Sequence, residues 1–462
     1  MAAPQSHRES FEKEETPYTS RAHSYVDDPE KQEQHLHHQQ QDQSDTLRKY
    51  STDGSPLEIS SSHLSVPASP YIPDGGFTAW FQVTSGFFLF FNSWGLINAF
   101  GVFQSYYKST LIPYETESNL SWIGSIEAFL LCCCTIFAGP AFDRGYGRTL
   151  VIAGTLMVVF GMMMTSLCTT YWQLMLAQGL CMGIGHGGLF IVSIAIVPSY
   201  FSTKRSFAIG LAASGSSLGG VIYTIVFHRL IDVHHLSFGW ATRILGFMAL
   251  GTLVIPCVCI KQRAIPAAPR KNIIDFSGFK ELPFSLFSLA SFVGFIGLYI
   301  PFFYISTFSS TKAGLDDIMA FYMLPILSAG SVAGRILPGF AADYLGPLNM
   351  LSFCTVVAGI LGFCWIAIPA HASVGGLLVW SLLYGCFSGA FVIPFVGGRL
   401  GMNTFCAALG LLIGTPIAGV ILGDNNAWTG LQAFCGATLL AGGALVMVTR
   451  WSRAGAGLAR RA

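Results

Sequence analysis

The sequence predicts an all-α membrane protein in which twelve transmembrane helices form two pseudo-symmetric six-helix bundles. Three observations favour this fold class. Hydrophobic residues make up 52% of the 462-residue chain and charged residues only 11%, whereas soluble proteins carry about 25% charged residues. Twelve apolar segments are long enough to cross a bilayer, which takes about 20 residues. A short Gly- and Asp-containing pattern occurs once in each half of the chain.

The expected spans fall into two groups of six, separated by the longest internal polar stretch. The spans are 79–104, 121–141, 149–168, 173–197, 206–227 and 241–261, then 284–308, 318–341, 349–369, 374–395, 402–422 and 428–450. The chain is therefore divided into a tail (1–73), an amino-terminal bundle (74–261), a cytoplasmic linker (262–283), a carboxy-terminal bundle (284–450) and a second cytoplasmic tail (451–462).

The tail before the first span is expected to be disordered. It is rich in Gln, Ser, His and Glu and has no apolar run, so it cannot bury enough surface to offset its chain entropy. It holds 12 of the 24 acidic residues and only 6 of the 25 basic ones. The remaining chain is therefore distinctly basic, and the position of its basic residues can be used to orient it.

Lys and Arg side chains are concentrated on one side of the expected spans. With the amino terminus inside, 15 of them fall at cytoplasmic positions, and only Lys108, Arg229, Arg243 and Lys312 fall outside. Because cytoplasmic loops carry the excess of basic residues, both termini are expected in the cytoplasm. The plasma membrane is the expected location, with a vacuolar or other endomembrane left open.

Small residues recur along one side of the fifth span. Ala208, Ala212, Ser216 and Gly220 follow one another at every fourth position, which places them on one helix face. Small residues allow close approach of helices inside lipid. This face is therefore expected to pack tightly against another helix.

An internal repeat supports the division into two halves. Gly139-Pro-Ala-Phe-Asp143 follows the second span and Gly339-Phe-Ala-Ala-Asp343 follows the eighth. Internal repeats are typical of transporters whose substrate binds between the halves. The two aspartates can accept hydrogen bonds from helix amino termini or pair with nearby bases. We expect a gating role for these loops and for the basic residues beside them, which are Arg144, Arg148, Lys204 and Arg205.

These features resemble the major facilitator superfamily. Two motifs, Asp74-Gly-Gly-Phe-Thr-Ala-Trp80 and the stretch Tyr200–Gly220, are similar to the two signatures of its monocarboxylate transporter family, and the fungal monocarboxylate-permease-like branch is the most similar. The resemblance covers residues 74–450. It implies a secondary transporter that moves a small organic anion or metabolite by alternating access, possibly with protons.

The sequence departs from that family at three places. Val102 stands where mammalian members have a Lys, and Ser331 stands where they have an Asp, although the family's arginine is present as Arg335. These changes put lactate-type proton symport in doubt. The connection at 395–402 is also shorter than in relatives, and a deletion and a gene-model error are two explanations.

Several polar residues inside the expected spans are candidates for substrate binding. The guanidinium of Arg335 offers a fixed fork of donors that suits a carboxylate, unless it reaches to the inner surface. The resemblance places the first, fifth and seventh spans around the central cavity, so the candidates there are Asn92, Asn98, Tyr223, Tyr299 and Tyr304. The alternative is that these five residues hold helices together. The many Phe residues are expected to face lipid or to pack.

Two ionisable residues are candidates for proton coupling, because a charged group inside a membrane is costly and needs a reason. His186 lies in the middle of the fourth span, and Glu127 is the one acid clearly within a span. The alternatives are a neutral histidine bonded to a neighbouring helix and a carboxylate that reaches the outer water.

Other features bound the function. No cofactor, metal site or nucleic-acid partner is expected, and no grouping of residues indicates an enzyme or an ATP-driven pump. The protein is expected to be a monomer in the lipid bilayer with a small-molecule substrate. Asn119 begins the one glycosylation sequon, in the first outer loop. The alternatives to coupled transport are a metabolite efflux facilitator without proton coupling and a non-transporting sensor or scaffold.

Overall fold

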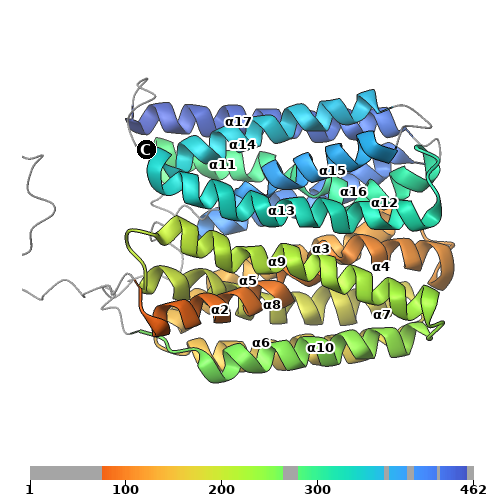
Figure 1. Ribbon diagram of the computed structural model, residues 1–462, viewed down its shortest axis with the longest axis horizontal. Coiled ribbons are helices and arrows are strands. Elements are labelled where there is room, and N and C mark those ends of the chain that lie inside the picture. The colour runs from red at the N-terminus through yellow and green to blue at the C-terminus, as the bar shows by residue number, and fades with distance from the viewer. Residues whose placement is uncertain (1–74, 264–278, 369–373, 393–399, 424–426, 455–462) are drawn as a thin grey trace, which may run out of the picture. The chain divides into compact units, whose positions relative to one another are not determined.

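The computed structural model describes residues 75–263, 279–368, 374–392, 400–423 and 427–454. The expected amino-terminal tail, residues 455–462 of the expected carboxy-terminal tail, most of the linker and residues 395–399 of the short connection lie outside these ranges, as does Asp74 of the first motif. Residues 451–454, expected in the tail, are helical. All of the described residues belong to one compact unit. Figure 1 shows them as a layered arrangement of long, roughly parallel helices.

The amino-terminal half contains six helical segments, three of which are interrupted. The first comprises α2 (Phe77–Asn92), α3 (Trp94–Asn98), α4 (Phe100–Tyr106) and a π-helical turn (Tyr107–Leu111). The second and third segments are α5 (Glu117–Asp143) and α6 (Gly147–Thr165). The fourth is interrupted and consists of α7 (Tyr171–Leu174), a π-helix (Met175–Met182) and α8 (Gly183–Ile196). The fifth is α9 (Arg205–His228), which ends in a π-helical turn (Arg229–Val233), and the sixth is α10 (Phe238–Cys259).

The carboxy-terminal half repeats this arrangement. Its elements are α11 (Leu282–Leu298), α12 (Ile300–Thr311), α13 (Asp317–Leu345), α14 (Pro347–Cys364), α15 (Val374–Gly389), α16 (Leu400–Leu422) and α17 (Trp428–Ala454). Here α11 and α12 together form one segment, so the half again has six.

The predicted number of spans is confirmed with one qualification. Within the described ranges, eleven helices are long and apolar enough to cross a membrane, and α15 is shorter. Its 16 residues give a length of about 24 Å at about 1.5 Å per residue, less than the about 30 Å of a hydrocarbon core. A 3₁₀ turn continues it over Ala390–Val392, and the rest of the expected span falls outside the described residues.

The two repeated Gly-x-x-x-Asp patterns are helical and are not loops, which corrects the expectation. Asp143 is the last residue of α5, and Asp343 lies two residues before the end of α13. Both helices continue through the pattern although α5 has Pro140 within it and α13 has Pro338 directly before it.

The two halves contact each other through two related pairs of helices. The second long helix of each half packs along the fifth helix of the other, so α5 contacts α16 and α13 contacts α9. Figure 1 shows α9 and α13 side by side where the two halves meet. The two contacts involve equivalent helices of the two halves, as the expected pseudo-symmetry requires.

Close approach along α9 depends on its small residues. Ala208, Ala212, Ser216 and Gly220 are all buried, as predicted. On other sides of the helix, a Cβ added at Gly210 would overlap the carbonyl oxygen of Arg335 on α13, and one added at Gly215 would overlap that of Phe87 on α2. The helix is therefore clamped between both halves.

Polar contacts join the halves in each of these helix pairs. At the end of the α9–α13 pair predicted to be cytoplasmic, Asp343 accepts hydrogen bonds from the backbone N–H groups of Ser206 and Phe207, each at 3.0 Å. In the α5–α16 pair, the hydroxyls of Ser125 and Thr415 are 2.5 Å apart.

Candidate functional site

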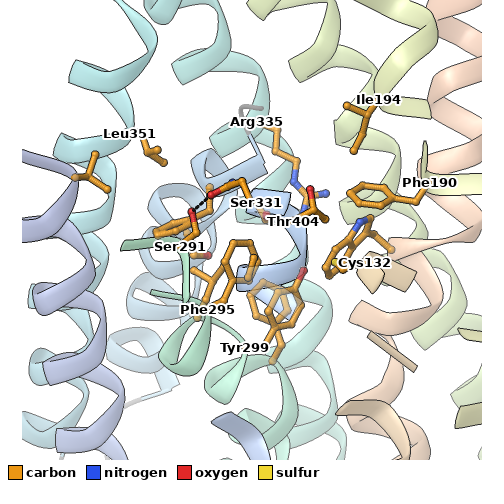
Figure 2. Close-up of a pocket in the computed structure, with 18 of the residues that line it drawn as sticks. Cys132, Phe190, Ile194, Ser291, Phe295, Tyr299, Ser331, Arg335, Leu351 and Thr404 are labelled. Atoms are coloured by element: carbon orange, nitrogen blue, oxygen red, sulfur yellow. Dashed lines mark hydrogen bonds between the residues drawn. The ribbon is translucent and has the colours of Figure 1, made fainter. Parts of the chain in front are cut away.

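A cavity lies between the two halves. Its empty space, together with the open solvent at its mouth, is about 970 Å³. The amino-terminal half contributes four lining residues, Trp94 from α3, Cys132 from α5, and Phe190 and Ile194 from α8. The larger part of the wall comes from the carboxy-terminal half. Figure 2 shows Cys132, Phe190 and Ile194 facing Ser291, Phe295 and Leu351 across the pocket.

Aromatic rings form much of the cavity wall. The rings of Trp94 and Tyr299 stack across the two halves with centroids 5.5 Å apart, and Phe190 meets Trp94 edge-on at the same distance. The other aromatic lining residues are Phe287, Phe295, Phe302 and Phe391. Such rings offer flat apolar surfaces on which another ring can stack. The wall therefore suits a planar, largely apolar molecule.

Arg335 is the one charged residue among the described residues of this wall. Its side chain is 3% exposed, and Nη1 donates to the carbonyl oxygen of Ala213 at 2.9 Å and to the hydroxyl of Ser216. Both acceptors are on α9 and are neutral. Among the described residues no carboxylate pairs with Arg335, and its Nε has no hydrogen-bond partner. A buried cation without a counter-ion favours the binding of an anion.

Hydroxyl and amide groups add polarity on the carboxy-terminal side of the cavity. Ser291 donates to Asn403 Oδ1 at 3.0 Å, and Ser388 and Thr404 also line the wall. The hydroxyl of Ser331, which the resemblance to mammalian monocarboxylate transporters matches with an Asp, has no hydrogen-bond partner among the described residues. It lies four residues before Arg335 on α13, so it faces the same space (Figure 2).

Of the six predicted substrate-binding residues, only Arg335 and Tyr299 line this cavity. Asn92 instead lies within the amino-terminal half, where its Oδ1 accepts from the hydroxyls of Tyr223 at 2.6 Å and Thr252 at 3.0 Å. Its Nδ2 donates to the Phe88 carbonyl. These bonds connect α2, α9 and α10, so Asn92 and Tyr223 fit the alternative role of holding helices together.

Asn98 and Tyr304 are also engaged in contacts between helices. Asn98 Nδ2 donates to the carbonyl oxygen of Ser216 on α9 at 3.1 Å. The hydroxyl of Tyr304 lies 2.7 Å from that of Ser121 and donates to the carbonyl of Thr415. It therefore joins α12 to α5 and α16, on the predicted outer side of the cavity.

The two proton-coupling candidates are brought together. Glu127 on α5 and His186 on α8 are fully buried, and Glu127 Oε1 lies 3.2 Å from His186 Nδ1. The carboxylate therefore does not reach outer water, contrary to the alternative expectation for Glu127. Neither residue lines the cavity.

The predicted gating residues lie at helix ends. Lys204 precedes α9 and is exposed, Arg205 begins that helix, and Asp343 accepts from the two following N–H groups. Arg144 follows α5 and is exposed, while Arg148 Nε donates to the carbonyl of Cys257 on α10. Asp143 is exposed at the end of α5.

Two further sequence observations can be placed. Asn119 lies in the first turn of α5 and not in the preceding loop, with Nδ2 donating to Glu115 at 2.8 Å. Val102, which the resemblance to mammalian monocarboxylate transporters matches with a Lys, is buried in α4.

The aromatic lining was missed because sequence alone gave it no distinguishing signal. The chain has 37 Phe residues, and many that do not line the cavity are equally buried, such as Phe303 and Phe308 on α12. Phe190, Phe295 and Phe302 line the cavity and also pack against other aromatic rings, as expected. Sequence alone does not distinguish Trp94 as a lining residue either, although it lies between the candidates Asn92 and Asn98.

Comparison with known proteins decides the family. The model of the Major Facilitator Superfamily matches residues 83–397, more than half of the chain. The chain belongs to the major facilitator superfamily. It is a multi-pass integral membrane protein and a transporter.

Named relatives agree with this assignment. The MFS-type transporter dbaD of Emericella nidulans is 45% identical over 390 residues, covering 81% of this chain and 86% of that protein. The agnestins efflux protein AgnL12 of Paecilomyces divaricatus is 37% identical, covering 86% and 92%. The aspyridones efflux protein apdF of Emericella nidulans is 35% identical, covering 82% and 79%.

A solved structure shows the same fold. A variant of the nucleoside transporter NupG aligns with a TM-score of 0.61 at 12% sequence identity, covering 80% of this chain and 99% of that one. At this identity the likeness concerns the fold alone. The monocarboxylate branch stays a resemblance that rests on the two sequence motifs.

Proposed function

We propose that this protein is a secondary transporter that exports a flat, acidic, aromatic metabolite by alternating access of the cavity to the two sides of the membrane. It performs no chemistry on its cargo. The proposal includes a monomer in the plasma membrane with both termini in the cytoplasm. Asp343 and its counterpart Asp143 then act as latches at the cytoplasmic ends of their helices.

Arg335 carries the proposal. It is a buried cation on the cavity wall whose described partners are all neutral. An ionisable residue at membrane depth is costly and indicates a functional site. A bound carboxylate would supply the missing counter-charge and could accept from the guanidinium fork. This favours an anion over a neutral or cationic cargo.

The wall of the cavity favours an aromatic anion over a small one such as lactate. Ligand pockets are typically lined by apolar and aromatic side chains, with a few polar groups that orient the ligand. Here the rings of Trp94, Phe190 and Tyr299 lie on the same wall as Arg335. A small acid would leave most of this aromatic surface uncovered. The loss of the family's Lys and Asp at Val102 and Ser331 also argues against lactate-type symport.

The direction of transport is inferred from relatives and from physics. Two relatives are named as efflux proteins, one for agnestins and one for aspyridones. A negative potential inside the cell favours exit of an anion by about 2.3 kcal/mol per charge for each 100 mV. Export of an acidic metabolite agrees with both.

Ligand-induced thermal stabilisation of the purified full chain tests the binding site. A ligand that binds only the folded state stabilises it, and the stabilisation grows with concentration. Naphthalenesulfonate should raise the melting temperature of the wild type, whereas naphthalenemethanol, which lacks the charge, and lactate, which lacks the rings, should raise it much less. Arg335→Gln should abolish the response to naphthalenesulfonate.

Arg243→Gln is the matched control, because Arg243 lies on α10, outside the cavity, where its guanidinium is over the ring of Trp240. This variant should respond as the wild type does. An equal response to the charged and neutral naphthalenes, or a full response by Arg335→Gln, would reject the anion site.

A further inference from the structure

Glu127 and His186 form an acid–base pair inside the amino-terminal half, outside the cavity. Their side chains have no exposed surface, and Oε1 and Nδ1 are 3.2 Å apart. None of the four polar side-chain atoms of the pair has a hydrogen-bond partner among the described residues, so the 3.2 Å contact between Oε1 and Nδ1 is a close approach and not an aligned hydrogen bond. Buried polar groups normally have such partners. A pair left in this state at membrane depth calls for a function.

Glycines in α8 make the pair possible. A Cβ on Gly183 would lie 3.1 Å from Cα of Glu127, and one on Gly187 would lie 2.5 Å from Cβ of Cys134. These positions, three residues before and one residue after His186, therefore let α8 approach α5 closely. Side chains there would push the two helices apart and separate the carboxylate from the imidazole.

Within the described part of the chain, no second ion compensates the pair. The elements packed against α5 and α8 contribute the thiols of Cys181 and Cys406 and the phenols of Tyr106 and Tyr107. Helix α5 itself carries the thiols of Cys132–Cys134. The charged residues of these elements, Lys108, Glu117, Asp143 and Arg148, lie at or near helix ends. Lys108, for example, donates to the backbone carbonyls of Pro113 and Glu115.

The phenol of Tyr107 supplies no positive charge either. Its hydroxyl donates a hydrogen bond to Gln178 Oε1 at 2.7 Å. The pair must therefore balance its charge internally.

Charge balance requires a proton. With a carboxylate and a neutral imidazole the pair has a net charge of −1, and burial of an uncompensated charge is strongly unfavourable. One added proton makes the pair neutral overall, either as carboxylic acid with imidazole or as carboxylate with imidazolium. Burial therefore favours the state of the pair that carries this added proton.

We propose that Glu127 and His186 together bind one proton and form the coupling site of the transporter, separate from the cavity that holds the cargo. The inference rests on the proposed export function. In one cycle the pair takes a proton from the outer side and releases it to the cytoplasm, while the anion moves outward. The proton is only bound and released, so no other bond changes.

The helices that hold the pair also reach the cavity and the other half. Phe190, one turn after His186 on α8, lines the cavity, as does Cys132, five residues after Glu127 on α5. The distance along the helix from His186 to Phe190 is about 6 Å. Ser125, two residues before Glu127, meets Thr415 of α16 across the halves. Binding or release of a proton by the pair can therefore affect both the cavity wall and the contact between the two halves, which must rearrange during transport.

Transport by reconstituted full-length protein tests the coupling. Naphthalenesulfonate is a suitable labelled probe because it stays ionised, so it brings no proton of its own. Vesicles with an acidic interior and a clamped membrane potential should accumulate it as protons leave. Glu127→Gln should lose this accumulation but retain exchange of labelled for unlabelled probe. Asp317→Asn, which changes an exposed acid at the start of α13, should behave as the wild type.

Infrared spectroscopy gives a readout that does not need transport. A protonated buried carboxyl has a C=O stretch distinct from that of carboxylate, and Glu127→Gln should remove that band while His186→Gln should change its dependence on pH. The inference is overturned if Glu127→Gln accumulates the probe as the wild type does, or if no carboxyl band depends on Glu127. Failure of exchange in the wild type would instead reject the proposed cargo class, and the infrared result would still decide the proton site.

Discussion

Asn92 illustrates how a polar residue inside a membrane protein can serve structure. Its Oδ1 accepts two hydroxyl donors from different helices, and it is fully buried. In Asn92→Leu the hydroxyl of Tyr223 loses its acceptor, which should cost about 1–3 kcal/mol of stability. The melting temperature of the purified protein should fall, and its affinity for naphthalenesulfonate should be unchanged.

A double variant separates the lost bond from lost packing. Asn92→Leu lowers the stability because it leaves the hydroxyl of Tyr223 without an acceptor. Adding Tyr223→Phe removes that hydroxyl and should restore part of the stability. A reduced affinity at unchanged stability would instead show that Asn92 contacts the cargo.

At the residue scale, sequence predicted the identity of rare groups better than their partners. Arg335, Glu127 and His186 were evident because ionisable residues are scarce in the spans. The residues that surround these groups were not evident. Asn92 and Tyr299, for example, are both polar and buried, and both lie on helices expected to line the cavity. Which of them lines the cavity depends on helix rotation, and the first span is broken at Ser93 and Ala99, where a uniform helical period fails.

At the scale of elements, contact between α13 and α15 depends on glycine. A Cβ on Gly385 of α15 would overlap the carbonyl oxygen of Leu327 on α13. Gly385→Ala should therefore force the two helices apart and destabilise the protein by about 1–3 kcal/mol, seen as a lower melting temperature.

Gly375→Ala on the same helix provides the control. Nothing lies within 4 Å of an added Cβ at Gly375 among the described residues, so the same substitution there should leave the melting temperature unchanged or slightly raised. Equal effects at both positions would mean that helix propensity, and not packing, sets the outcome.

The elements themselves followed from hydropathy, and their ends did not. The second and eighth helices continue through their Gly-x-x-x-Asp patterns to Asp143 and Leu345, because charge at a helix end does not stop the backbone hydrogen bonding. The π-helical turns at Tyr107–Leu111 and Met175–Met182 carry no composition that sets them apart from regular helix.

At the scale of the whole molecule, the halves meet through equivalent helices and enclose a cavity whose buried cation, Arg335, has only neutral partners among the described residues. The repeat and the polar stretch at 262–283 predicted the two halves. The aromatic wall could not be predicted, because it is assembled from α3, α8, the segment α11–α12 and the 3₁₀ turn that holds Phe391, which lie in separate parts of the sequence. A path for an organic anion between the halves is the central claim.

Exchange transport in proteoliposomes tests that claim most directly. Vesicles loaded with unlabelled naphthalenesulfonate should take up the labelled compound faster than empty vesicles when they contain the wild type or Arg243→Gln. Arg335→Gln, if folded by its melting curve, should show no such stimulation. Stimulated exchange by Arg335→Gln at the wild-type rate would contradict a transport path through this cavity.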